Sequence, residues 1–328
     1  MSRANIVGEN LLTALSSRFH APGIIDQVYD KSNALLFRLN RNKGRVSGGY
    51  QIEQTFVVEE WSNGGWFSDF DVLDTAPNDT VANGKWEMSQ LAIPVTFSHR
   101  QLIEAAPSGG SNRDEANRLY DVVGTQWELA KTHMTHLLGK AIHSDQGPKA
   151  LEPLTVIVND ASGAAEYAGL SRTTYPFLEA QVDDTSSTLT MGLLREMVAS
   201  CTKGGHTTSL ILSRREQYSR LHSLMVANQY FSTPAPDLES AGFRHIGWEG
   251  IPWVVDDYVA DGPDTNNSRI YFLNEDAMDL YTWGGVDYQV MPFKWPADQA
   301  ACVGHLLWYG QLVSNRPQVQ GVLTNVSS

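Results

Sequence analysis

One segment constrains the fold more than any other: about 30 residues without proline in which apolar side chains recur at a helical spacing. The apolar positions are three or four residues apart, so they form one continuous stripe along a helix. They are Ala116, Leu119, Val123, Trp127, Ala130, Met134, Leu137 and Ala141. Asn112 and Glu115 have the spacing of a capping box at the start of this stretch. We therefore predict a helix over 111–143, which would be about 48 Å long.

An extended β-hairpin is predicted before this helix. Residues 50–61 alternate with a period of two, with Phe56 on the more apolar face. Residues 62–84 are dense in Gly, Asn, Asp and Ser, which is typical of a long hairpin tip. Residues 85–97 are interpreted as the return strand, where Pro94 implies an edge position or a bulge.

Aromatic side chains mark the tip of the predicted hairpin as a contact surface. They are Trp61, Trp66, Phe67 and Phe70. A hairpin that stands away from its domain is marginally stable alone in water, and large exposed aromatics are typical of interfaces. A compact domain of 328 residues is only about 50 Å across, so the hairpin and the helix would each cross it. We therefore predict an extended subunit whose hairpin contacts another copy.

The charges are unevenly distributed along the chain. It carries 24 Lys and Arg against 37 Asp and Glu, a net charge of −13, which disfavours general binding of nucleic acid. Residues 1–48 have a local charge of +4, whereas residues 49–104 have −7. In one interpretation the two segments attract their counterparts on other copies, with Arg38, Arg41 and Arg45 as contact residues. In the other, both are solvated surfaces without a partner.

The second half of the chain alternates helices and strands, as a mixed α/β domain does. Helices are predicted over 188–201 and 214–231, and strands over 208–213, 243–258 (two strands about a turn at Gly250), 269–274, 278–283 and 305–326 (a final hairpin that turns at Asn315–Pro317).

A search for chemistry yields no catalytic, cofactor-binding or metal-binding residue. His133 and His136 lack the Glu of a zinc-protease helix, so we interpret them as surface histidines. Two aspartate doublets, Asp183–Asp184 and Asp256–Asp257, are assigned to turns or strand ends, because adjacent side chains on a strand point to opposite faces. Cys201 and Cys302 are interpreted as buried packing residues; as two distant thiols they form no disulfide framework, which favours a reducing compartment.

The sequence also argues against a membrane location. No apolar stretch approaches the about 20 residues that a bilayer-spanning helix needs. The first residues lack the uninterrupted apolar core of a signal peptide. We therefore expect a soluble protein that is made in the cytoplasm.

Three segments resemble the major capsid proteins of tailed phages that have the HK97 fold. Residues 169–221 are similar to the family's succession of an Arg-and-Tyr segment, a helix, a Gly turn, a short apolar strand and a Tyr-containing helix. Residues 247–257 (GWEGIPWVVDD) and 269–281 (RIYFLNEDAMDLY) resemble two of its strands. These patterns follow the basic segment, the hairpin and the long helix in the family's order, across nearly the whole chain.

The resemblance implies an α+β fold with five parts. They are an N-terminal arm at 1–46, a hairpin called the E-loop at 47–98, a P-domain at 99–186 that includes a spine helix at 111–143, an A-domain at 187–290, and a return to the P-domain at 291–328.

The same resemblance implies a structural protein of the virion and not an enzyme. The chain would assemble with itself into hexamers and pentamers of an icosahedral phage head in the host cytoplasm. That head would enclose double-stranded DNA without sequence-specific binding. A separate scaffold protein or none is implied, with portal and decoration proteins as further partners, and no cofactor or membrane.

Some members of this family join an E-loop Lys to a C-terminal Asn of another subunit. Lys85 is the only Lys in the predicted hairpin, and Asn315 and Asn325 are the candidate acceptors. The alternative is a solvated Lys85 without such a role.

Two other functions stay open. The same fold forms the shell of encapsulin nanocompartments, which package enzyme cargo in place of DNA. A carboxylate-dependent hydrolase is the third hypothesis, suggested by nine Trp and twelve Tyr. It predicts a monomer with a pocket, against which the hairpin and the long helix argue.

Overall fold

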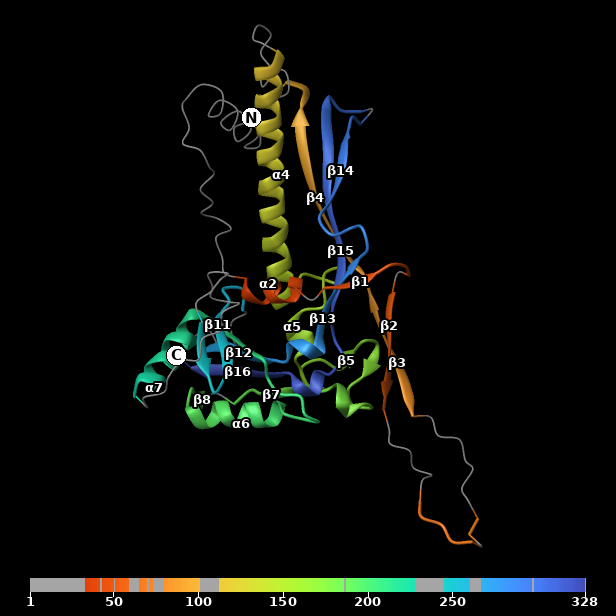
Figure 1. Ribbon diagram of the computed structural model, residues 1–328, viewed down its shortest axis with the longest axis vertical. Helices are drawn as coiled ribbons and strands as arrows, with labels where there is room; N and C mark the ends of the chain where they lie inside the picture. The colour runs from red at the N-terminus through yellow and green to blue at the C-terminus, as the bar shows by residue number, and fades with distance from the viewer. Residues whose placement is uncertain are drawn as a thin grey trace. The chain divides into compact units, whose positions relative to one another are not determined.

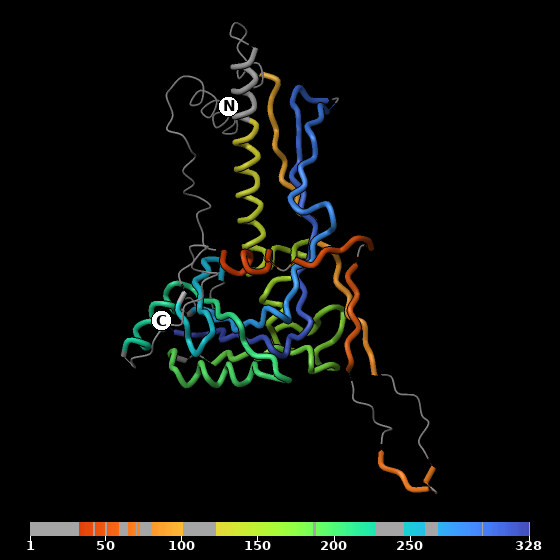
Figure 2. The backbone as a smooth tube through the Cα atoms, viewed as in Figure 1, coloured from red at the N-terminus to blue at the C-terminus, as the bar shows by residue number. Residues whose placement is uncertain are grey.

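The structure is a computed structural model of the chain, shown as a ribbon in Figure 1 and as a backbone tube in Figure 2. It describes residues 33–41, 43–49, 51–58, 65–69, 71–72, 80–100, 112–185, 187–227, 245–259, 267–296 and 298–327. These residues belong to two compact units. The first unit combines Gln90–Leu138 with Trp283–Tyr309, and the second combines Ser32–Ser89, Gly139–Thr282 and Gly310–Ser328.

Helices and strands are both present, so the predicted α+β class is confirmed. The helices are α2 (Ala34–Arg41), α4 (Asn112–His143), α5 (Leu154–Ile157), α6 (Met191–Cys201) and α7 (Arg215–Ala227), with 3-10 turns η1 (Pro176–Leu178), η2 (Glu275–Ala277) and η3 (Pro317–Val319). The strands are β1 (Gly44–Val46), β2 (Gln51–Val57), β3 (Val81–Glu87), β4 (Ser89–Ser98), β5 (Glu166–Tyr167), β6 (Leu170–Ser171), β7 (Gln181–Asp183), β8 (Ser187–Thr188), β9 (Leu210–Ser213), β10 (His245–Trp248), β11 (Ile251–Val255), β12 (Asn267–Leu273), β13 (Met278–Trp283), β14 (Gln289–Lys294), β15 (Ala301–Ser314) and β16 (Gly321–Ser327).

In the first unit, α4 packs against a sheet in which β15 pairs with both β4 and β14 (Figure 2). Trp127 of α4 lies against Phe293 of β14, with ring centroids 5.4 Å apart, and Phe293 meets Phe97 of β4 edge to face at 5.5 Å. Gly304 of β15 makes room for these rings, because a Cβ there would lie 2.9 Å from Phe293 and 3.1 Å from Trp127. The predicted long helix is therefore confirmed, and so is its apolar stripe at Trp127.

The second unit is built on a sheet of seven strands. Its order is β10-β11-β9-β12-β16-β7, with β8 beside β16. β12 runs antiparallel to both neighbours, whereas β11 is parallel to β9 and β7 is parallel to β16. The predicted turn at Gly250 is confirmed: Glu249 and Gly250 connect β10 to β11 with φ angles of 50° and 84°, as the favoured two-residue hairpin turns require.

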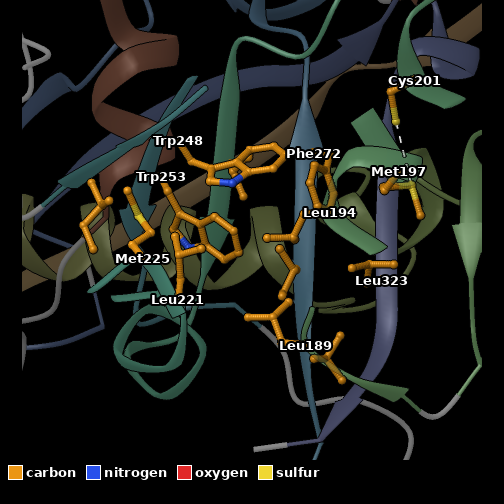
Figure 3. Close-up of a cluster of buried hydrophobic side chains, with 14 residues drawn as sticks. Leu189, Leu194, Met197, Cys201, Leu221, Met225, Trp248, Trp253, Phe272 and Leu323 are labelled. Carbon is orange, nitrogen blue, oxygen red and sulfur yellow. Dashed lines mark hydrogen bonds between the residues drawn. The ribbon is translucent and has the colours of Figure 1, made fainter. Parts of the chain in front are cut away.

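α6 and α7 pack on one buried cluster of this sheet (Figure 3). Leu194 and Met197 of α6, Leu221 of α7, Trp253 of β11 and Phe272 of β12 all belong to it. Thr190 caps α6, since its side-chain oxygen accepts a hydrogen bond from the backbone N–H of Leu193 at 3.2 Å. Such a core of large apolar side chains is what fixes the sheet and both helices as one folded body.

The predicted bounds of the return strand of the hairpin, 85–97, are wrong. Residues 81–87 form the return strand β3, and residues 89–98 form a separate strand, β4, which pairs with β15. The buried positions change from even to odd numbers between Trp86 and Ile93, so one continuous strand could not bury both sets on the same face. Pro94 does lie on a strand with a single partner among the described strands, as its edge position predicts.

The predicted final hairpin over 305–326 is also wrong. β15 and β16 do not pair with each other; β15 joins β4, β13 and β14, and β16 joins β7, β8 and β12. Both strands are buried on both faces near the turn that connects them. The two apolar strands therefore do not form a hairpin, because each has its hydrogen-bonding partners in a different sheet.

Candidate assembly surfaces

The hairpin of β2 and β3 is attached to the second unit by aromatic rings at its root. Trp86 is almost fully buried, and its ring meets Phe56 and Tyr167 edge to face at 6.2 and 5.7 Å. Phe56 also packs on Phe177 at 5.8 Å. The backbone N–H of Lys85 donates to the Ala168 carbonyl at 2.9 Å. One face of the hairpin therefore packs on the rest of the second unit, and the opposite face points outward.

The outer part of this hairpin exposes apolar side chains. Val57 and Val81 face each other across the two strands, and both are more than half exposed. Trp66, Phe67 and Val72, in the described part of the tip, are 105%, 69% and 97% exposed. We call these five residues the hairpin apolar surface. Exposed apolar groups of this size, concentrated on one element, are typical of a protein interface.

Two of the four predicted tip aromatics belong to the hairpin apolar surface, namely Trp66 and Phe67. Trp61 and Phe70 lie outside the described residues. Their assignment to a contact between subunits stays a prediction for all four.

The predicted basic contact residues lie on α2 and β1. Arg38 is already engaged within its own chain, because its Nε is 2.5 Å from a carboxylate oxygen of Glu275. Burial raises the pKa of Glu275, and the Arg38 charge opposes that shift. Arg41 and Arg45 are exposed. The end of the segment predicted as an arm is thus folded on the second unit, and the role of Arg38, Arg41 and Arg45 toward another copy stays a prediction.

The three residues of the predicted crosslink have different surroundings. Lys85 extends over the exposed face of the hairpin and pairs with Glu53 at 3.2 Å. Asn315 donates from its side-chain nitrogen to Asp279 at 3.0 Å, and Asn325 is buried. The crosslink stays a prediction.

Asp256 has a role that the sequence did not reveal. Both aspartate doublets do lie at strand ends, as predicted, since Asp183 is the last residue of β7 and Asp256 follows β11. Asp256, however, is fully buried and lies 3.4 Å from Nε2 of the equally buried His143. Its carboxylate also accepts from the backbone N–H groups of Leu35 at 3.3 Å and Tyr258 at 3.0 Å. It therefore joins the start of α2, the end of α4 and the end of β11.

Arg172 is a second buried polar residue without a counterpart in the sequence analysis. Its guanidinium donates to four backbone carbonyls, those of Val156, Ile157, Ala164 and Leu178, at 2.7 to 3.2 Å. Burial lowers the pKa of this group. An Arg that donates hydrogen bonds to several carbonyls holds irregular loops in place. The only sign of this role in the sequence was the position of Arg172 in the capsid-like segment 169–221.

The histidines and cysteines considered for chemistry are all among the described residues. His133 and His136 stack with ring centroids 6.3 Å apart on α4, and the described residues contain no group of three His, Cys, Asp or Glu that could hold a metal ion. Cys201 and Cys302 are buried thiols, as predicted, and burial raises the pKa of Cys201 to about 12. None of the described helices has the length and apolar character of a membrane span.

Comparison with known proteins identifies the fold. No family model and no curated protein matches the sequence. Among solved structures, the chain is similar to a subunit of the cyanophage A-1(L) capsid, at 16% identity and a TM-score of 0.67 over 97% of this chain and 99% of that one. The capsid of a native GTA particle matches at 10% identity and a TM-score of 0.59, over 96% of both chains.

A third similar structure is a nanocompartment shell. The SrpI encapsulin of Synechococcus elongatus PCC 7942 matches at 13% identity and a TM-score of 0.56, over 98% of this chain and 95% of that one. These likenesses extend over nearly the whole of every chain. The predicted HK97-like capsid fold is therefore confirmed.

Proposed function

We propose that the chain is the major structural protein of a phage head, in which many copies form a closed icosahedral shell of hexamers and pentamers around double-stranded DNA. The observation that carries this proposal is the match of 97% of the chain to a cyanophage capsid subunit. The hairpin apolar surface supports it, because a subunit with such a surface gains free energy when a neighbour covers it.

In the proposed shell, the hairpin apolar surface lies on an adjacent copy. The root of the hairpin packs on its own subunit through Trp86 and Phe56. The exposed tip is therefore attached to the subunit through a fixed root. Trp66 and Phe67 would then supply the apolar contact, as large aromatics do at the centre of interfaces. The shell would assemble in the host cytoplasm and become part of the virion, without catalysis, and with scaffold, portal and decoration proteins as further partners.

A nanocompartment shell is the second candidate, and the likeness to the SrpI encapsulin favours it. Both candidates share the shell and differ in its contents. Particles purified from cells that make the chain naturally would contain nuclease-protected double-stranded DNA in the first case and a folded protein in the second.

The test of the shared proposal is assembly of the purified protein, followed by size-exclusion chromatography and negative-stain electron microscopy. We expect closed polyhedral particles, or rings of five and six, for the chain alone or after addition of a candidate scaffold protein. A monodisperse monomer under both conditions would overturn the proposal.

A further inference from the structure

The register of the hairpin determines which backbone groups β2 directs away from its partner strand. Val58 follows β2, and its N–H donates to the Thr80 carbonyl at 2.8 Å, so the hydrogen-bonded pairs of the ladder include the even-numbered residues of β2. The backbone groups of the odd-numbered residues Thr55 and Val57 therefore point away from β3. β3 shows the same alternation, because the N–H of odd-numbered Lys85 donates to a carbonyl outside the hairpin.

The outer edge of β2 borders a cavity of about 490 Å³, which we call the root groove. Residues 54–57 of β2, Phe177 of η1 and Gln318 of η3 are part of its lining. None of the described lining residues belongs to β3. The groove therefore lies along the edge of the hairpin to which the backbone groups of Thr55 and Val57 point.

β2 lacks the features that usually keep a strand edge from pairing with another chain. It contains no proline, and its one charged side chain, Glu53, is paired with Lys85 at 3.2 Å. Within the described part of the chain, no residue accepts a hydrogen bond from the N–H groups of Thr55 and Val57. Such an edge is a template for an extended segment, which gains main-chain hydrogen bonds from the strand and specificity from the groove beside it.

We propose that the root groove receives the hairpin tip of an adjacent copy, whose residues around Trp66 and Phe67 extend along the outer edge of β2. This inference rests on the proposed function and names the surface of the neighbour that covers the tip.

The apolar groups of the tip and of the groove suit this contact. The rings of Trp66 and Phe67 are exposed at the tip, and the lining of the root groove includes Phe177 and Ala277. Val57, which is 74% exposed, also lines the groove. One contact therefore covers two parts of the hairpin apolar surface, the tip of one copy and the Val57 end of the next, and gains free energy from both.

The charges of the two surfaces are also complementary. Residues 59–79 carry six carboxylates, two Glu and four Asp, and no basic side chain. The root groove is lined by the exposed Arg316 and by His206, whose backbone is hydrogen-bonded to that of the exposed Lys203. Asp276 is the one carboxylate among the described lining residues, so the two cations outnumber it. An acidic tip is therefore attracted to this groove.

The proposed contact has the symmetry that a ring needs. The tip of one copy and the root groove of the next are different surfaces, so the contact between them is heterologous. Heterologous contacts that repeat around an axis produce a closed ring when the rotation closes. Hexamers and pentamers of the proposed shell are rings of this kind.

The first test is hydrogen–deuterium exchange of the natural chain, resolved to single amides, in the free subunit and in assembled shells. We expect the amides of Thr55 and Val57 to exchange at least about tenfold more slowly in shells, because they gain hydrogen-bond acceptors. The amides of Gln54 and Phe56, which already bond to β3, should be protected in both states. This odd–even alternation distinguishes an added strand from a general loss of solvent access.

The second test identifies the segment that occupies the groove. A chain with Ser68→Cys in the tip and Gln318→Cys in the groove should form a ladder of disulfide-linked copies when shells are treated with a mild oxidant, and a reductant should remove it. The matched control combines Ser68→Cys with Glu196→Cys, an exposed position on α6, and should form no ladder. Cys201 and Cys302 are buried and stay out of the reaction.

Two results would overturn the inference while the proposed function stands, because shells have formed in both. One is a set of shells in which Thr55 and Val57 exchange as fast as in the free subunit. The other is protection of these amides without a link between tip and groove, which would assign the edge to a different segment.

A chain that forms no shells would contradict the proposed function, and the groove is then tested separately. A synthetic peptide of residues 62–73 is added to the free subunit at about 1 mM, a concentration that detects even weak binding. We expect protection of the amides of Thr55 and Val57. Unchanged exchange at both amides would overturn the inference in this case as well.

Discussion

Gly84 determines how closely β3 approaches the aromatic rings of the hairpin root. A Cβ at this position would lie 2.7 Å from the Phe56 ring and 3.0 Å from Cβ of Ala168. Ala168 has a φ of 55°, a backbone conformation that residues other than glycine rarely adopt. Its carbonyl accepts the hydrogen bond from the backbone N–H of Lys85. Neither neighbour can therefore move away without breaking a contact that holds the hairpin.

We expect Gly84→Val to lower the free energy of unfolding by about 1–3 kcal/mol, because the added side chain overpacks this site. Urea denaturation of the unassembled subunit measures the change. Gly48→Val is the control, since a Cβ at Gly48 has no heavy atom within 4 Å. Equal losses in the two variants would contradict the packing argument.

Asp256 is the residue whose loss should cost most among the aspartates. Asp256→Ala leaves the buried N–H groups of Leu35 and Tyr258 without their acceptor, and we expect a loss of about 2–4 kcal/mol in the free energy of unfolding. Asp184→Ala, at an exposed strand-end position, should stay within about 0.5 kcal/mol of the natural chain. Thermal unfolding of both variants decides the matter, and similar midpoints would show that the Asp256 contacts are dispensable.

At the scale of elements, α4 packs in the first unit through an aromatic contact between Trp127 and Phe293. Trp127→Asp would place a charge against Phe293 and the backbone of Gly304, so we expect a loss of about 2–4 kcal/mol. Glu128→Gln, one position further and exposed, is the control. The measurement is urea unfolding followed by circular dichroism, and an unchanged midpoint for Trp127→Asp would place the buried face of the helix elsewhere.

The elements that the sequence predicted are those whose signal is local. α4, α6, α7 and the Gly250 turn depend on spacing, capping and φ preferences within a few residues of chain. The pairing of β4 with β15, and the separation of β15 from β16, depend on partners more than 200 residues away or on a choice between two sheets. For β4 the sequence held a usable signal, because the alternating apolar positions change from even numbers (86 and 88) to odd numbers (91, 93, 95 and 97). For β16 no local pattern distinguishes the two sheets.

The candidate surface was predicted only in part, for a similar reason. Aromatic side chains in a polar tip identified Trp66 and Phe67, because exposure follows from the composition around them. The roles of Asp256 and Arg172 depend on burial among segments that come together only in the fold. The sequence of a single chain does not indicate which charged residues will be buried.

At the scale of the whole molecule, assembly should depend on the hairpin apolar surface and hardly on other exposed apolar groups. We expect the double variant Trp66→Ser, Phe67→Ser to fold with an unchanged melting temperature and to lose shell formation, since both side chains are exposed in the subunit. Val226→Ser on α7 removes an exposed apolar group elsewhere, with 65% exposure, and should assemble normally. Normal shells from the double variant in electron micrographs would exclude the tip as a required contact.

Because β15 and β16 belong to two different sheets, their late position in the chain determines when these sheets can form during synthesis. β15 is the strand on which β4, β13 and β14 all pair, and β16 joins β12 to β7 and β8. Both follow every one of their partners in the chain, so during synthesis neither sheet can close until residues 301–327 have left the ribosome. The pairing of β4 with β15 joins segments more than 200 residues apart, and pairings this distant in sequence form slowly. A nascent chain therefore cannot complete either sheet before these last two strands are available.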